Sequence, residues 1–217
     1  MPVSLPDRAA AAEALAGVGR RFYGRGWVMG TSGNFSAVLA ERPLRLLVTP
    51  SGAHKGTLPA GHLLEVDGRG RVVGGSGPTS AETPLHLAIV RARGARAVLH
   101  THSVWATILS DLHAAAGGVE ITGYEMLKGL EGVTSHEHRE WIPVVGNDQD
   151  VPRLGRAFGA ALRRHPGAHA VLIAGHGLYT WGATIATAER QVEILEFLFD
   201  VIGRTTEARH GTRQNPR

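Results

Sequence analysis

Apolar residues along this chain recur either with helical spacing or in short continuous runs, and the two patterns alternate. Helical spacing predicts helices at residues 7–24, 81–93, 104–112, 151–164 and 184–203. Short apolar runs bounded by turn-forming residues predict strands at residues 44–49, 72–73, 97–101, 141–145 and 170–174. This alternation, without an internal repeat or a long linker, predicts a single α/β domain over residues 1–217. The basic end, residues 205–217, is expected to form a flexible tail.

Composition narrows the class of protein. The 217 residues are 43% hydrophobic and 19% charged, which suits one globular domain. The chain has no cysteine, which excludes disulfides, thiolate metal sites and a cysteine nucleophile. No apolar stretch approaches the roughly 20 residues that span a bilayer, and the N-terminus lacks the layout of a signal peptide, so we expect a cytoplasmic protein. The net charge of +4 is modest, and no nucleic-acid motif accompanies it.

Histidines at the ends of two predicted strands are the strongest chemical signal. His100 and His102 end one apolar run, and a His-x-His pair on a strand directs both imidazoles to the same face. His176 ends a second run and stands between Gly175 and Gly177. Three neutral imidazoles form a metal site that keeps open coordination positions, which is typical of a catalytic metal. Zinc suits this donor set best, and iron, manganese and cobalt are the alternatives.

Three loops rich in Gly, Ser and Thr form the second signal. Such loops let backbone N–H groups and hydroxyls approach an anion, so together they are suited to one phosphate. Each loop alone is also typical of an ordinary turn, and none matches a P-loop or a dinucleotide fingerprint. The candidate phosphate-binding residues within them are Ser32, Gly33, Asn34, Ser51, Gly52 and Ser80.

Several polar residues admit two interpretations. Glu82 is the fourth residue of a Thr-x-x-Glu pattern, so it is either a helix-capping residue or part of the site. Lys55 is either a partner for phosphate or a solvated side chain. A second His-x-His, at residues 136–138, lies among charged residues and is expected in a solvated loop. The other histidines, among them His86 and His169, have no partner at ligand spacing.

The order and spacing of these motifs resemble the class II aldolase/adducin family over residues 9–203. The resemblance implies a three-layer α/β/α domain with a mostly antiparallel central sheet. It implies that His100, His102 and His176 bind one divalent metal per subunit, usually Zn²⁺, and that the Ser/Gly loops bind the phosphate of a small sugar substrate. It also implies a homotetramer with active sites near the subunit interfaces, and neither a nucleic-acid nor a membrane partner.

Two segments resemble one branch of this family, the methylthioribulose-1-phosphate dehydratases. They are residues 125–130, Glu-Met-Leu-Lys-Gly-Leu, and residues 176–182. The resemblance implies dehydration of 5-methylthioribulose 1-phosphate to 2,3-diketo-5-methylthiopentyl 1-phosphate in methionine salvage, with Glu125 as catalytic acid and base. The alternatives are a sugar-phosphate aldolase or epimerase acting on a pentulose or deoxyhexulose phosphate, and a non-catalytic adducin-like module. Intact metal ligands argue against the module.

Overall fold

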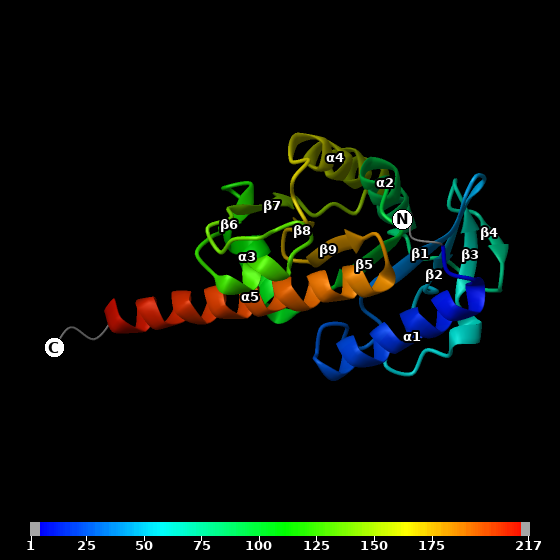
Figure 1. Ribbon diagram of the computed structural model, residues 1–217, viewed down its shortest axis with the longest axis horizontal. Helices are drawn as coiled ribbons and strands as arrows, with labels where there is room; N and C mark the ends of the chain where they lie inside the picture. Colours follow the sequence, from blue (N-terminus) through cyan, green and yellow to red (C-terminus); the bar gives the residue numbers. More distant parts are fainter. Residues whose placement is uncertain (1–4, 214–217) are drawn as a thin grey trace.

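The computed structural model describes residues 5–213, and one mixed β-sheet runs through the whole of this part (Figure 1). The strand order is β4-β3-β2-β1-β5-β9-β8-β7-β6, and every neighbouring pair is antiparallel except β7 and β8. The strands are β1 (Asn34–Glu41), β2 (Leu44–Val48), β3 (Leu64–Asp67), β4 (Val72–Gly74), β5 (Ala97–Thr101), β6 (Gly118–Ile121), β7 (Glu140–Val145), β8 (Ala170–Ile173) and β9 (Gly177–Gly182).

Helices cover both faces of this sheet. The α-helices are α1 (Arg8–Gly24), α2 (Thr83–Arg93), α3 (Val104–Leu112), α4 (Val151–Arg164) and α5 (Ile185–Arg213), and short 3₁₀ turns are η1 (Ala60–His62) and η2 (Glu125–Gly129). Apolar side chains of α2 and α4 form a core with one face, whereas those of α1, α3 and α5 pack on the other. The expected three-layer α/β/α arrangement with a mostly antiparallel sheet is therefore confirmed.

Side-chain caps explain where three of the helices begin. Asp7, Ser103 and Asp150 each accept a hydrogen bond from a backbone N–H of the first turn of α1, α3 and α4. These bonds satisfy donors that a helix start otherwise leaves unpaired. The cap at Ser103 turns the chain from β5 into α3 directly after the His-x-His pair, so it fixes the strand end that carries two candidate ligands.

Most predicted elements occur within two residues of their expected bounds, but four strands were not predicted. These are β1, β3, β6 and β9, which lie in Gly-rich or mixed sequence where local patterning is weak. The long C-terminal helix also differs from expectation, because α5 continues to Arg213 rather than ending near Gly203. Residues 205–213 of the expected tail are therefore helical, and residues 214–217 lie outside the described part of the chain.

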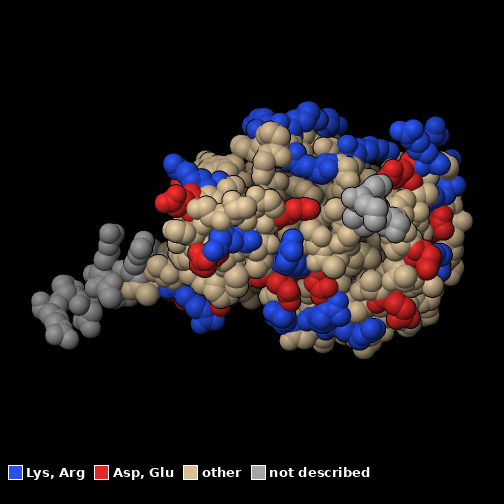
Figure 2. All heavy atoms as spheres, viewed as in Figure 1, with Lys and Arg blue, Asp and Glu red and all other residues tan. Residues whose placement is uncertain are grey.

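Charged side chains of both signs are spread over the surface. On the face shown in Figure 2, basic side chains gather along the upper edge, where α4 lies, and acidic and basic groups mix elsewhere. No helix within the described residues is both long and apolar enough to cross a bilayer.

Close strand packing at the centre of the sheet positions the histidines. β5 and β9 are hydrogen-bonded neighbours, with Thr101 opposite Leu178, so the ends of both strands meet. A Cβ atom on Gly177 would lie 2.1 Å from the carbonyl oxygen of Thr101, so only glycine permits this approach. Gly33 has a positive φ of 70°, and a Cβ there would meet the carbonyl oxygen of His100 at 2.6 Å.

Candidate active site

Three imidazoles converge at the junction of β5 and β9. The Nε2 atom of His102 lies 2.7 Å from Nε2 of His100 and 3.2 Å from Nε2 of His176. His100 is fully buried, and its ring stacks on Tyr179 with 3.9 Å between ring centroids. The predicted triad is thus brought together by two strand ends that are 74 residues apart in sequence.

The protonation of His100 and His102 suits a divalent cation. Nδ1 of His100 donates to the carbonyl oxygen of Leu178 at 2.9 Å, which leaves a lone pair on Nε2 facing the other two rings. Burial lowers the pKa of His100 well below its usual value, and burial lowers that of His102 to about 4. Neutral imidazoles with converging lone pairs are ligands of the kind that zinc prefers, so the residues fit the metal that the motif implies.

Glu82 is the fourth group at this cluster. Its Oε1 lies 3.2 Å from Nε2 of His176, and its Oε2 lies 3.5 Å from Nε2 of His100. Glu82 occupies the N-cap position of α2 but makes no side-chain capping bond, so the capping-box interpretation is wrong. The backbone N–H of Glu82 donates instead to Ser80 Oγ at 3.2 Å. The Glu82 carboxylate faces the histidines.

A buried hydrogen-bond chain holds Glu82 in place. Asn34 Nδ2 donates to Glu82 Oε2 at 2.6 Å, and Asn34 Oδ1 lies 2.5 Å from Nε2 of His86. The Asn34 oxygen must accept, so His86 carries its proton on Nε2 and accepts from Ser36 Oγ at Nδ1, 2.8 Å away. Burial lowers the pKa of His86 to about 3, which keeps this ring neutral. Sequence reasoning missed this role, because Asn34 and His86 are 52 residues apart.

A second support lies behind the His-x-His pair. Thr101 Oγ1 donates to Glu196 of α5 at 2.9 Å, and both side chains are buried. Burial raises the pKa of Glu196 to about 7 despite hydrogen bonds from Thr101 and Ser103. This contact ties the ligand-bearing end of β5 to the longest helix and was not visible in the sequence.

All three Ser/Gly loops open onto one cavity of about 340 Å³ beside the histidines. His102, His176 and Glu82 form part of its wall. The lining includes every candidate phosphate-binding residue: Ser32, Gly33, Asn34, Ser51, Gly52 and Ser80. A larger hollow of about 400 Å³ between α1 and the start of α5 is lined mainly by small apolar residues and holds none of the candidate ligands, so the chemistry belongs to the loop cavity.

Two polar groups in the loop cavity are poised for an anion. Lys55 is buried and donates to the carbonyl oxygen of Thr31 at 2.7 Å, and burial lowers its pKa to about 8. Ser32 Oγ is buried without a hydrogen-bond partner among the described residues. Burying a hydroxyl without a hydrogen-bond partner costs free energy, and a bound ligand that hydrogen-bonds to it removes this cost. The solvated interpretation of Lys55 is therefore wrong. The Asn34 amide faces Glu82 and His86, so it acts as a brace in this chain.

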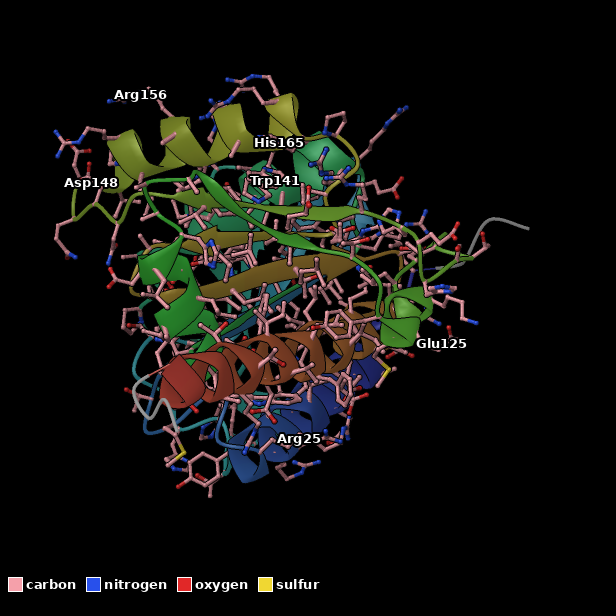
Figure 3. The ribbon with its side chains drawn as sticks, turned by 90° about the vertical axis from the view of Figure 1, so that its left-hand side faces the viewer. Arg25, Glu125, Trp141, Asp148, Arg156 and His165 are labelled. Carbon is pink, nitrogen blue, oxygen red and sulfur yellow. The ribbon has the colours of Figure 1, made fainter. Side chains whose placement is uncertain are left out.

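Glu125 lies away from this cavity. It begins η2, and 70% of its side chain is exposed, paired with Lys128. β6 and β7 place Ile121 opposite Glu140, whereas Val145 at the other end of β7 pairs with Ile173 near the histidines. Figure 3 accordingly shows Glu125 at one side of the molecule and Asp148, just beyond β7, at the other. Within one chain, Glu125 and the histidines therefore lie at opposite ends of the strands, and we call these two edges the ends of the sheet.

Comparison with known proteins agrees with this architecture. The family model of the Class II Aldolase and Adducin N-terminal domain matches residues 13–202. A methylthioribulose-1-phosphate dehydratase from Methylococcus capsulatus is 48% identical over 201 residues, 92% of this chain and 94% of the relative. One from Marinobacter nauticus is 44% identical over 193 residues, 88% of this chain and 92% of the relative.

Solved structures of lower identity share the fold. The YgbL protein of Klebsiella pneumoniae is 27% identical with a TM-score of 0.77, covering 92% of this chain and 91% of that one. The L-fuculose-1-phosphate aldolase of Thermus thermophilus is 24% identical with a TM-score of 0.74, covering 94% of this chain and 98% of that one. Together with the family match, these similarities show that the chain belongs to the class II aldolase and adducin family.

Proposed function

We propose that this protein is a metal-dependent hydro-lyase of methionine salvage. It removes water from 5-methylthioribulose 1-phosphate and yields 2,3-diketo-5-methylthiopentyl 1-phosphate. The observation that carries the proposal is the convergence of His100, His102 and His176 at the wall of a cavity lined by three anion-binding loops. The choice of substrate rests on the dehydratases that are 44–48% identical over most of the chain.

The three histidines would hold the metal through nitrogen, with a Glu82 oxygen beside it as a fourth donor. The donor set of three neutral imidazoles favours Zn²⁺. When bound, such an ion supplies Lewis acidity to the substrate ketone and so acidifies the adjacent C–H bond. The buried brace of Asn34 and His86 keeps the Glu82 side chain directed at the same point.

The loops bind and orient the substrate phosphate. Ser32, Ser51 and Ser80 contribute hydroxyls, and the glycines beside them let backbone N–H groups approach the oxygens. Lys55 neutralises part of the phosphate charge from within the cavity. Fixing the phosphate also fixes the position of C3, which is where the first proton leaves.

Glu125 transfers the protons in this proposal. Its carboxylate removes the C3 proton and then protonates the C4 hydroxyl as that group leaves, and the resulting enol tautomerises to the diketone. Lys128 lowers the pKa of Glu125, so the carboxylate is ionised and ready to accept a proton at neutral pH.

Glu125 must come from a neighbouring subunit, because it lies at the opposite end of the sheet from its own histidines. In a homotetramer, the edge of the sheet that carries Glu125 in one chain would meet the histidines of the next chain. Exposed apolar side chains give such a neighbour a surface to bury: Val104, Ile108 and Leu112 along α3, and Phe197 on α5.

A product assay tests the function. Purified protein reconstituted with Zn²⁺ and given 5-methylthioribulose 1-phosphate is expected to form the diketone, detected by mass loss of one water. Release of dihydroxyacetone phosphate or glycolaldehyde from pentulose or deoxyhexulose phosphates, without diketone formation, would instead identify an aldolase. A purified protein that binds no metal and is inactive in both assays would indicate a non-catalytic module.

A further inference from the structure

A second cluster of metal-ligating side chains lies at the end of the sheet that is distant from the cavity. Glu140, the first residue of β7, is 1% exposed, and His138 and His169 flank it. Glu140 Oε2 lies 2.8 Å from Nε2 of His138 and 2.8 Å from Nδ1 of His169. These spacings match those among the candidate ligands at the cavity, which are 2.7 and 3.2 Å.

Further hydrogen bonds orient two of the three donors. His169 Nε2 donates to the carbonyl oxygen of Glu131 at 2.8 Å, so Nδ1, which donates to Glu140, is the nitrogen that would bind an ion after giving up its proton. The other oxygen of Glu140, Oε1, accepts from the backbone N–H of His169 at 2.9 Å, so Oε2 is the single oxygen that faces both imidazoles. Metal-bound histidines and carboxylates are held by outer hydrogen bonds of this kind.

The cluster is accessible from solvent. The side chain of His138 is 33% exposed and that of His169 is 17% exposed, whereas Glu140 is closed off beneath them. An ion can therefore enter past His138. Two imidazoles and one carboxylate, with a position left open toward water, are donors that zinc and similar first-row ions accept, and they are poorly matched to Mg²⁺ or Ca²⁺.

We propose that His138, Glu140 and His169 form a second divalent transition-metal site of the zinc type, distinct from the site at the cavity. The ligands join the start of β7 to the residue before β8, and the Glu131 carbonyl joins both to the segment between β6 and β7. The ion would link the two chain segments on either side of residues 122–139. The proposal is independent of the proposed reaction, because its ligands contact none of the cavity residues.

Zinc stoichiometry of the full chain tests this site. Protein stripped with a chelator is titrated with Zn²⁺ against a chromophoric competitor, in four forms. Wild type is expected to bind two ions per chain and His138→Gln one. A His102→Ala/His176→Ala protein is expected to bind one, and the combination with His138→Gln none. The affinity lost at the substituted site should be about 100-fold or more.

His138→Gln suits the test because an amide can still donate to Glu140, so the fold should persist, as circular dichroism would verify. His136→Gln is the matched control: it removes an exposed imidazole from the same segment and should leave two ions bound. One ion in wild type, or none in His102→Ala/His176→Ala, would overturn the second site and leave the proposed function untouched. Two ions retained in His138→Gln would also overturn it. If His138→Gln fails to fold, the number of ions bound by the His102→Ala/His176→Ala protein still tests the second site.

Discussion

The two ends of the central sheet carry chemically active groups in different ways. At the end formed by β5 and β9, His100 and its partners converge within one chain, supported by a buried network through Asn34 and His86. At the other end, Glu125 stands on a short 3₁₀ turn with 70% of its side chain exposed. One end is preorganised by packing, whereas the other becomes part of a site only when a neighbour covers it.

The largest loss of turnover among these predictions should come from substituting Glu125, at the exposed end of the sheet. Glu125→Gln keeps the size of the side chain but removes the proton carrier, so turnover should fall by roughly 100- to 10,000-fold. Metal content should stay at the wild-type level, because Glu125 is not one of the proposed metal ligands. Steady-state kinetics and metal analysis of the same preparation provide the comparison. Turnover at the wild-type rate would remove Glu125 from the mechanism.

His176→Ala is the matched substitution at the preorganised end. It removes a candidate ligand, so both turnover and metal at the cavity should be lost, in contrast to Glu125→Gln. Cavity-site metal that is unchanged in His176→Ala would contradict the assignment of ligands.

Glu82→Gln should produce a smaller effect at the same end. The amide keeps the hydrogen bond to Asn34 in one orientation but loses the charge beside His100 and His176. Metal affinity at the cavity should fall about 10- to 100-fold, which is the usual cost when a group that supports a metal site is altered. The measurement is a zinc competition titration with Asn34→Ala as a companion, because loss of the brace should weaken binding in the same direction. Unchanged affinity in both variants would show that Glu82 has no part in holding the ion.

The smallest effect concerns the pH dependence of stability. Burial holds the pKa of His86 at about 3 in the folded protein, against about 6.5 when unfolded. As the pH falls from 7 to 5, the unfolded chain therefore takes up a proton that the folded chain refuses, and stability decreases. This residue should account for about 2 kcal/mol of that loss.

Urea unfolding of His86→Gln at pH 7 and pH 5 tests this contribution of His86 to stability. The loss of unfolding free energy between pH 7 and pH 5 should be about 2 kcal/mol smaller than in wild type. His62→Gln, which removes an exposed histidine on η1, serves as the control and should retain the wild-type difference. An equal pH response in His86→Gln and wild type would show that His86 is not held neutral.

Local sequence patterns predicted the preorganised end better than the exposed end. The His-x-His pair and His176 follow apolar runs, and strand periodicity alone places the two side chains of the pair on one face. The partnership of Asn34, Glu82 and His86 could not be predicted, because it depends on β1 and α2 meeting across the sheet. The expectation of a solvated loop at residues 136–138 is wrong for His138 for the same reason. Its ring bonds to buried Glu140, and the other partner of Glu140 is 29 residues away in sequence.

The position of Glu125 was also beyond local sequence. The motif around it indicated a catalytic role, but only the strand order reveals that β6 and β7 carry it away from the histidines of its own chain. Short motifs therefore predicted which residues are chemically active. Their location at two different ends of the sheet could be seen only from the strand order.

Subunit complementation tests this division most directly. Glu125→Gln and His176→Ala proteins, each inactive alone, are unfolded together, refolded as a mixture and assayed with 5-methylthioribulose 1-phosphate and Zn²⁺. If each site joins the histidines of one chain to Glu125 of the next, an equal mixture should regain about a quarter of wild-type activity, since about one interface in four pairs two intact halves. Mixed oligomers with no activity above that of the separate variants would contradict the account.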